Sequence, residues 1–252
     1  MTQNILMEVC IDSVESALNA IRGGANRLEL CGNVGLGGGT TPSFGLVRII
    51  HRAVESFQVP IMVMIRPRTG DFLYSESEMQ VMLEDIRIFK EMAGVEGFVF
   101  GVLTKEGRVD VTRTRRYTYL KNISPFELTI RTTSPLKARR CQSSCTSGQY
   151  KSASQTESLE TLASLLLATR NSSLTIMPGS GINPHTVRRV VNMLAPLGLS
   201  EIHLSGGRWT EGGMIFHGRE GMGMGIGAEG DWGIWQTDEG VIREVRALLE
   251  SM

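Results

Sequence analysis

The sequence predicts an α/β protein built on a parallel sheet, and three observations lead to this fold class. Short apolar runs of strand length recur along the chain, and each is followed by a stretch with apolar residues at helical spacing. Residues 61–65 are apolar without alternation, which is typical of a strand covered on both faces. Many of the 29 glycines stand just after such runs, where strand-to-helix turns need them.

The first half of the chain contains four strand–helix units in a row. Ser75 and Glu78 have the spacing of a capping box and mark the start of the third helix. The expected strands are residues 5–11, 27–31, 61–65 and 97–101, and the expected helices are residues 13–22, 43–57, 75–92 and 110–121. Repeated units of this kind indicate parallel strands joined by helices.

The last third of the chain resumes the pattern. The expected strands are residues 174–178 and 201–205, and the expected helices are residues 183–194 and 239–249. Between the last strand and the last helix, residues 208–237 are rich in glycine, methionine and tryptophan. We expect this segment to be a glycine-rich loop insertion that covers one end of the sheet.

The middle of the chain departs from the pattern. Closing an eight-stranded barrel would require two more strands before residue 174. Residues 123–131 can supply one, but residues 132–145 are then too short for both a helix and a strand. We therefore interpret residues 123–157 as an anomalous segment, in which the fifth-to-sixth βα unit is shortened or disrupted. The barrel is then either incomplete or loosely structured at this point.

The composition excludes several classes of protein. The 26 basic and 26 acidic side chains cancel, so no global field attracts nucleic acid or an anionic membrane surface. The sequence has no apolar stretch of about 18 residues that would span a bilayer, and we find no secretory signal at its start. Four cysteines without close pairing predict reduced thiols and a cytoplasmic protein.

Carboxylate, guanidinium, thiol and thioether side chains lie on one face of each of the first three strands. Because side chains alternate along a strand, these faces can be read from the sequence. The sets that share a face are Glu8 with Cys10, Arg27 with Glu29 and Cys31, and Met62 and Met64 with Arg66. If these faces point into a barrel, the thiols and thioethers meet near its upper end.

Soft sulfur ligands select Cu(I), so Cys10, Cys31 and Met64 are the candidate copper ligands. The alternative is that each cysteine is a small buried hydrophobic residue. Cys141 and Cys145 lie in the anomalous segment, and their spacing is loose for a shared metal ion.

The same region also permits an enzyme. Arg66, Arg68 and Asp71 follow the third strand, where barrel enzymes hold catalytic and binding groups. Glu8 and Glu29 paired with these arginines would be ionised carboxylates, one of them a general base. The alternatives are a solvated strand end for the arginines and a structural salt-bridge network for the four charges.

His203 stands on the last predicted strand and is a candidate proton carrier. The alternative is a hydrogen-bonded histidine of the core.

Glycine turns after the last two strands indicate an anion site. Backbone N–H groups at this place in barrels often hold phosphate. The residues concerned are Gly179, Ser180 and Gly181 after one strand, Ser205 and Gly206 after the next, and Thr41 at the same end of the barrel. Glycine turns at strand ends are common, but two arginines across the mouth strengthen the pattern. The enzyme would therefore act on a small anionic or phosphorylated metabolite.

Several segments resemble the CutC copper homeostasis family. The matching motifs include Met-Glu-Val-Cys-Ile-Asp-Ser at residues 7–13, Met-Ile-Arg-Pro-Arg at 64–68, Thr-Ser-Gly-Gln at 146–149 and Ile-Met-Pro-Gly-Ser-Gly-Ile at 176–182. They fall in the family's order and the resemblance covers nearly all of residues 5–122 and 146–206.

The resemblance implies a TIM-type (β/α)₈ barrel, one domain over residues 1–252, and a role in copper homeostasis through bound Cu(I). It also implies self-association into a homo-oligomer in the cytoplasm, with the nucleus as a further location. It does not imply a settled reaction.

One departure from the family concerns the fifth strand. The family carries Phe-His-Arg-Ala-Phe-Asp there, whereas residues 127–132 read Glu-Leu-Thr-Ile-Arg-Thr and the following helix is missing. We interpret this as a local deletion or as a misread exon junction. A further alternative is that the chain, which lacks the fifth-strand motif, is a nonfunctional or misannotated product. A transcript that encodes the same segment would rule out the misread junction.

Overall fold

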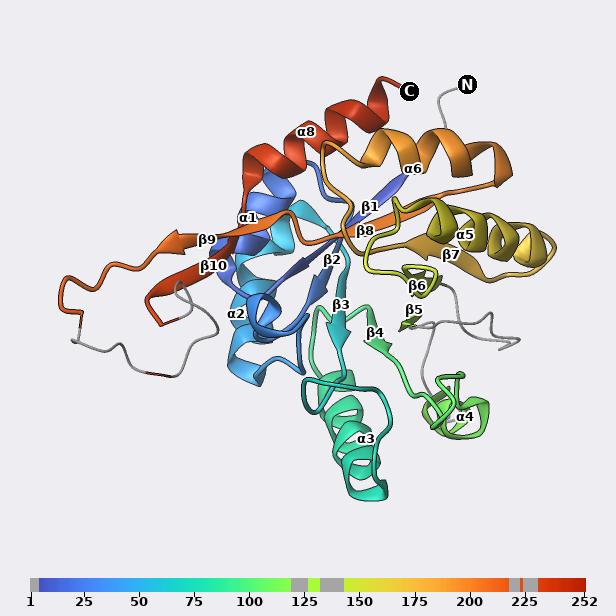
Figure 1. The fold of residues 1–252 in the computed structure, drawn as a ribbon. Helices are drawn as coiled ribbons and strands as arrows, with labels where there is room; N and C mark the ends of the chain where they lie inside the picture. The colour runs from blue at the N-terminus through green and yellow to red at the C-terminus, as the bar shows by residue number, and fades with distance from the viewer. Residues whose placement is uncertain (1–4, 119–126, 132–142, 218–222, 224–230) are drawn as a thin grey trace.

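The centre of the molecule is an eight-stranded parallel sheet with helices packed around it (Figure 1). The computed structural model describes residues 5–118, 127–131, 143–217, 223 and 231–252. The strand order is β7-β6-β5-β4-β3-β2-β1-β8. The strands are β1 (Leu6–Ile11), β2 (Arg27–Leu30), β3 (Ile61–Met64), β4 (Gly97–Phe100), β5 (Glu127–Arg131), β6 (Ser143–Thr146), β7 (Thr175–Pro178) and β8 (Glu201–Leu204).

The helices follow the strands where the sequence predicts them. Ser13 caps the first helix, and the capping box of Ser75 and Glu78 is confirmed at the start of α3. The helices are α1 (Val14–Arg22), α2 (Phe44–Val54), α3 (Glu76–Lys90), α4 (Val111–Thr118), α5 (Thr156–Thr169), α6 (Val187–Leu194) and α8 (Glu239–Glu250), with short 3₁₀ turns η1 (Val34–Leu36), η2 (Glu55–Phe57) and η3 (Ala195–Leu197). In the described part of the chain, none of them is long and apolar enough to cross a membrane.

The anomalous middle segment does contribute two strands to the sheet. β5 pairs with β4 on one side and with β6 on the other, and β6 pairs with β7. Residues 132–145 are too short for both a helix and a strand by the sequence analysis, and the structure shows that the strand is present, because β6 begins at Ser143. The connection of residues 132–142, which includes Cys141, lies outside the described residues, as do residues 123–126 of the expected fifth strand.

The two ends of the glycine-rich insertion, called its arms below, form strands. β9 (Gly207–Glu211) and β10 (Gly233–Thr237) form an antiparallel ladder in which Trp209 lies opposite Trp235. Their ring centroids are 5.6 Å apart in an edge-to-face arrangement. The two-stranded hairpin extends away from the main sheet (Figure 1). The expectation of a loop throughout residues 208–237 is therefore wrong for the two arms.

The two faces of the main sheet have different chemistry. Outward-facing residues such as Val9, Leu28 and Val63 pack with helix residues such as Ile50 in the main apolar core. The inward-facing residues Glu8, Arg27, Glu29 and His203 are charged or titratable, and all four are buried. Charged groups in such a place are stable only when they are paired.

Arg27 of β2 links strands from both ends of the sheet. Its Nε donates to Glu8 Oε2 on β1 at 2.5 Å, and its Nη2 donates to Glu201 Oε2 on β8 at 2.8 Å. Nη2 also lies 3.3 Å from Met177 Sδ on β7, and Ser143 of β6 donates to Glu201 at 2.9 Å. The sheet therefore curls until β6 and β7 meet β8 and β2 across the interior. The hydrogen-bonded ladder itself ends at β7 and β8 in the described residues.

We expect Arg27→Met to destabilise the fold by about 3–5 kcal/mol, because it leaves Glu8 and Glu201 without this buried cation. Urea unfolding measures the loss. Arg87→Met is the matched control, since Arg87 pairs with Glu84 at 3.1 Å on the exposed side of α3. That pair contributes at most about 1 kcal/mol. Equal, small losses in the two variants would contradict a structural role for Arg27.

Candidate functional site

A cavity of about 880 Å³ opens at the carboxyl ends of the parallel strands. Parallel α/β folds hold their ligands at this end of the sheet. Many of the residues around it lie on or directly after β1, β6, β7 and β8 or on the hairpin, and they include Cys10, Cys145, Thr146, Gly179, Ser180, Gly181, His203, Ser205, Gly206 and Trp235. Its volume is of the size that small-molecule sites occupy, roughly 300–1,000 Å³.

His203 lies between two buried carboxylates at the base of this cavity. The strand register sets this arrangement, because Glu8 pairs with His203 across β1 and β8, and Cys10 pairs with Glu29 across β1 and β2. His203 Nδ1 is 2.8 Å from Glu8 Oε1, and Nε2 is 3.5 Å from Glu29 Oε2. Each ring nitrogen therefore faces an acidic partner.

The environment favours the charged forms of both His203 and Glu8. Burial opposes the imidazolium, but electrostatic interactions with Cys145 and Glu29 and the hydrogen bonds to Cys10 and Glu8 raise the pKa of His203 well above 6.5. Burial also opposes the Glu8 carboxylate, but the hydrogen bond from His203 and the charge of Arg27 lower its pKa to about 2. The site therefore favours an imidazolium paired with the Glu8 carboxylate.

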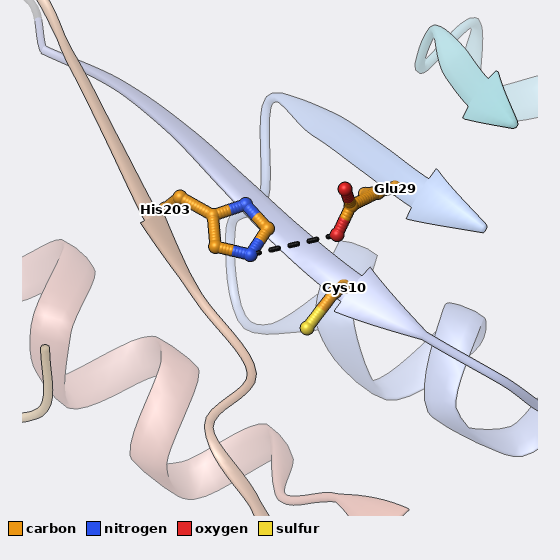
Figure 2. A group of neighbouring side chains, drawn as sticks. All are labelled: Cys10, Glu29 and His203. Atoms are coloured by element: carbon orange, nitrogen blue, oxygen red, sulfur yellow. Dashed lines mark ion pairs between the residues drawn. The ribbon is translucent and has the colours of Figure 1, made fainter. Parts of the chain in front are cut away.

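Three metal-ligating groups converge at this point. One ligand atom each from Cys10, Glu29 and His203 lies within 4.8 Å of the other two, and all three residues are buried (Figure 2). Thiolate, carboxylate and imidazole are all protein ligands for metal ions. Because Nδ1 is engaged by Glu8, Nε2 is the ring nitrogen left for a ligand, as in many metal sites.

The other two predicted copper ligands form an apolar cluster beside this point. Cys31 and Met64 pack with Cys10 and Val34, and Trp235 covers them. A Cβ atom added to Gly39 would lie 2.9 Å from Met64 Sδ and 3.0 Å from Cys31 Sγ, so both sulfurs border this glycine. The Cys31 thiol donates to the Glu29 carbonyl oxygen at 3.7 Å. The three sulfur residues predicted from the sequence therefore do lie together.

Arg66 organises the loop that follows β2. Its Nη1 donates to the carbonyl oxygens of Gly37 and Gly39, both at 2.8 Å, and its Nη2 donates to that of Gly70 at 2.9 Å. The guanidinium also lies 4.9 Å from the centre of the Phe72 ring. The expectation that Arg66 and Arg68 neutralise Glu8 is wrong, because Arg27 has this role.

Three other predicted site residues lie away from the cavity. Arg68 is 39% exposed and pairs with Glu78 at 2.5 Å and with Asp71 at 3.1 Å. Asp71 is 72% exposed. Thr41 Oγ1 accepts a hydrogen bond from the Arg66 backbone N–H at 2.9 Å. None of Arg68, Asp71 and Thr41 is among the cavity's lining residues.

The predicted anion-binding turns do border the cavity. Gly179, Ser180 and Gly181 follow β7, and Ser205 and Gly206 follow β8. The backbone of Ser180, Gly181 and Gly206 is left-handed, with φ of 75°, 69° and 54°. The Ser180 hydroxyl donates to the Lys151 carbonyl oxygen at 2.7 Å, so this side chain has a structural partner. Their role toward an anion stays a prediction.

Two residues are more important in the structure than their sequence signals indicate. Arg27 alternates with Glu29 and Cys31, and this spacing could have identified it as a partner for the carboxylates. Cys145 of β6 lies at the cavity, although its place in an irregular segment gives little indication of a site. Its signal is its position directly before Thr146-Ser147-Gly148, where a strand ends.

Comparisons with known proteins agree with the motifs in the sequence. The CutC family model matches residues 5–208. The copper homeostasis protein cutC homolog of Mus musculus is 36% identical over 257 residues, covering 98% of this chain and 90% of that protein. A family protein CutC of Vibrio vulnificus is 37% identical, with 98% of each chain covered.

A crystal structure of a CutC protein from Streptococcus agalactiae shares the fold, with a TM-score of 0.68 at 23% identity. The similarity covers 80% of this chain and 98% of that chain. On the family match and the full-length relatives, the chain belongs to the CutC family.

Proposed function

We propose that this chain is a cytosolic copper homeostasis protein that binds Cu(I) at the mouth of a (β/α)₈ barrel. The observation that carries the proposal is the convergence of Cys10, Glu29 and His203 within 4.8 Å at the base of the cavity. Copper homeostasis is also what the name of the mouse relative states. In this function copper is the cargo that the protein binds and releases.

The chemistry of the ligands fits a monovalent copper ion. Cys10 offers a thiolate and His203 an imidazole, and both suit copper, whereas Glu29 is a harder ligand. Cys31 and Met64 are the further sulfur donors that the sequence predicts, and they lie in the apolar cluster next to Cys10. Protein ligands bind a metal in their deprotonated forms, so loading requires His203 to lose a proton.

The proposal also covers the closure of the barrel, the cellular compartment and the assembly of the protein. Eight parallel strands in sequence order, curled around Arg27, support a closed barrel in one domain. The cysteines of the described part, Cys10, Cys31 and Cys145, form no disulfide with one another, which supports a reducing compartment such as the cytoplasm or nucleus. We further propose a homo-oligomer without nucleic acid or membrane partners, on the family resemblance and the balanced charge.

A second candidate function is catalysis on a small anionic or phosphorylated metabolite. The cavity of about 880 Å³ is far larger than a metal ion requires. Its base carries the cationic His203, and its rim carries the glycine turns at Gly181 and Gly206. Glu8 and Glu29 hold His203 in place, so this histidine is the group we would expect to move a proton.

We expect Cys10→Ser to weaken Cu(I) binding at least about tenfold, because even the loss of an outer-shell partner produces an effect of that size. Titration against a chromophoric Cu(I) chelator measures the affinity. Cys31→Ser and Met64→Leu, measured in parallel, show whether the neighbouring sulfurs also bind. Arg68→Ala is the control outside the cavity and should leave the affinity unchanged. An unchanged affinity in Cys10→Ser would contradict this site.

Copper affinity should rise with pH for as long as His203 stays protonated, because its proton competes with the metal. The pKa of His203 is raised well above 6.5, so this dependence should extend above pH 6.5. One displaced proton changes the affinity by up to about tenfold per pH unit. The same chelator titration at several pH values measures the slope. His203→Gln should bind more weakly and give a shallower slope, and an equal slope in both proteins would exclude His203 as a ligand.

If the second function holds, inorganic phosphate should bind in the cavity, and His203→Gln should weaken that binding because it removes the cation. Line broadening in the phosphorus NMR spectrum of phosphate detects it. Arg68→Ala is again the control, since Arg68 lies outside the cavity. Absence of broadening with the wild type at millimolar phosphate would count against an anionic ligand.

A further inference from the structure

Cys145 is a buried thiol at the cavity that the proposed copper ligands do not include. It stands on β6, is 7% exposed, and lines the same cavity as Cys10 and His203. It takes part in no disulfide bond among the described residues. A nucleophilic and soft group in this position needs a role or a structural reason.

The structure places its sulfur beside the imidazole of His203. A Cβ atom on Gly179 would lie 2.7 Å from Cys145 Sγ and 3.4 Å from both Cβ and Cδ2 of His203. The sulfur and the ring therefore border the same small space, which is open because residue 179 has no side chain. Cδ2 is bonded to Nε2, the ring nitrogen that faces Glu29 and remains available for a ligand.

The electrostatics agree with this proximity. Cys145 interacts electrostatically with His203, as Glu29 does. A neighbouring imidazolium in turn favours the thiolate form of a cysteine, which is the form that binds metal. Cys10 hydrogen-bonds to the same histidine. Two thiols thus approach one imidazole from two strands.

The group of Cys10, Glu29 and His203 contains only one soft donor. A set of one thiolate, one carboxylate and one imidazole serves zinc as readily as copper. A second thiolate changes this preference, because Cu(I) is selected by soft sulfur ligands. Cys145, which lines the same cavity as Cys10 and His203, is the residue placed to supply that thiolate.

We propose that Cys145 is a second thiolate ligand, so that Cys10, Cys145 and His203 together bind Cu(I). Glu29 then acts as a partner of the site rather than as a ligand. Binding involves no redox step, because Cu(I) enters and leaves as Cu(I) and the displaced protons pass to solvent. The inference rests on the proposed copper function and specifies its ligands.

X-ray absorption at the copper edge of the Cu(I)-loaded wild type tests the ligand set directly. We expect at least two sulfur neighbours per copper, and one fewer in Cys145→Ala. The Cu(I) affinity of Cys145→Ala should fall at least about tenfold, as for Cys10→Ser. Ser144→Ala is the matched control, since Ser144 is the adjacent residue of β6 and is absent from the cavity lining. It should leave both readouts unchanged.

The possible outcomes separate this inference from the function on which it rests. If the wild type does not compete for Cu(I), the copper function fails and the inference fails with it. If Cys10→Ser weakens binding while Cys145→Ala retains wild-type affinity and sulfur count, only the inference fails. A wild-type spectrum with fewer than two sulfur neighbours overturns it without any variant, so a folding defect in Cys145→Ala cannot obscure the result.

Discussion

The buried ion pair between Arg27 and Glu8 is the interaction on which the site depends. Glu8 accepts from Arg27 through one carboxylate oxygen and contacts His203 Nδ1 through the other. A carboxylate at this depth is stable in its charged form only with such partners. Because Arg27 keeps Glu8 ionised, Glu8 in turn fixes the orientation of the imidazole and leaves Nε2 facing Glu29 and the cavity.

The inward-facing side chains of the sheet therefore differ in chemistry between the amino ends and the carboxyl ends of the strands. At the amino end of the strands, Glu201, Arg27 and Ser143 satisfy one another in a closed network. At the carboxyl end, the inward-facing side chains include the thiols of Cys10 and Cys145, which border the cavity. A fully paired lower layer holds the strands in register, and the upper layer is free to bind a ligand. The inward-facing side chains near the amino ends of the strands thus stabilise the fold, and those near the carboxyl ends are available for function.

The fold could be predicted from the sequence wherever its elements follow a local pattern. Alternation along β1 and β2 correctly places Glu8 with Cys10 and Glu29 with Cys31, since this period is a property of every strand. The same alternation makes Arg27 a candidate partner for the carboxylates, but its pairing with Glu8 and Glu201 in particular could not be predicted, because it depends on strand register and on how far the sheet curls. Strand β6 escapes prediction because Ser143-Ser144-Cys145-Thr146 has no apolar run, although all four residues are buried. Their small side chains fit the crowded interior, where an apolar pattern would otherwise mark a strand.

The buried charges of the site do not by themselves decide which ion it would hold in the proposed function. Without metal, the imidazolium of His203 balances the carboxylates that surround it. When Cu(I) replaces the proton of Nε2, one unit of positive charge replaces another at His203, and the ion pairs of Glu8 with Arg27 and His203 keep their balance. The thiol ligands also lose their protons on binding, so the loaded site gains negative charge. The choice of ion in the proposed function therefore depends on the soft sulfur ligands, which select Cu(I), and not on the buried charges.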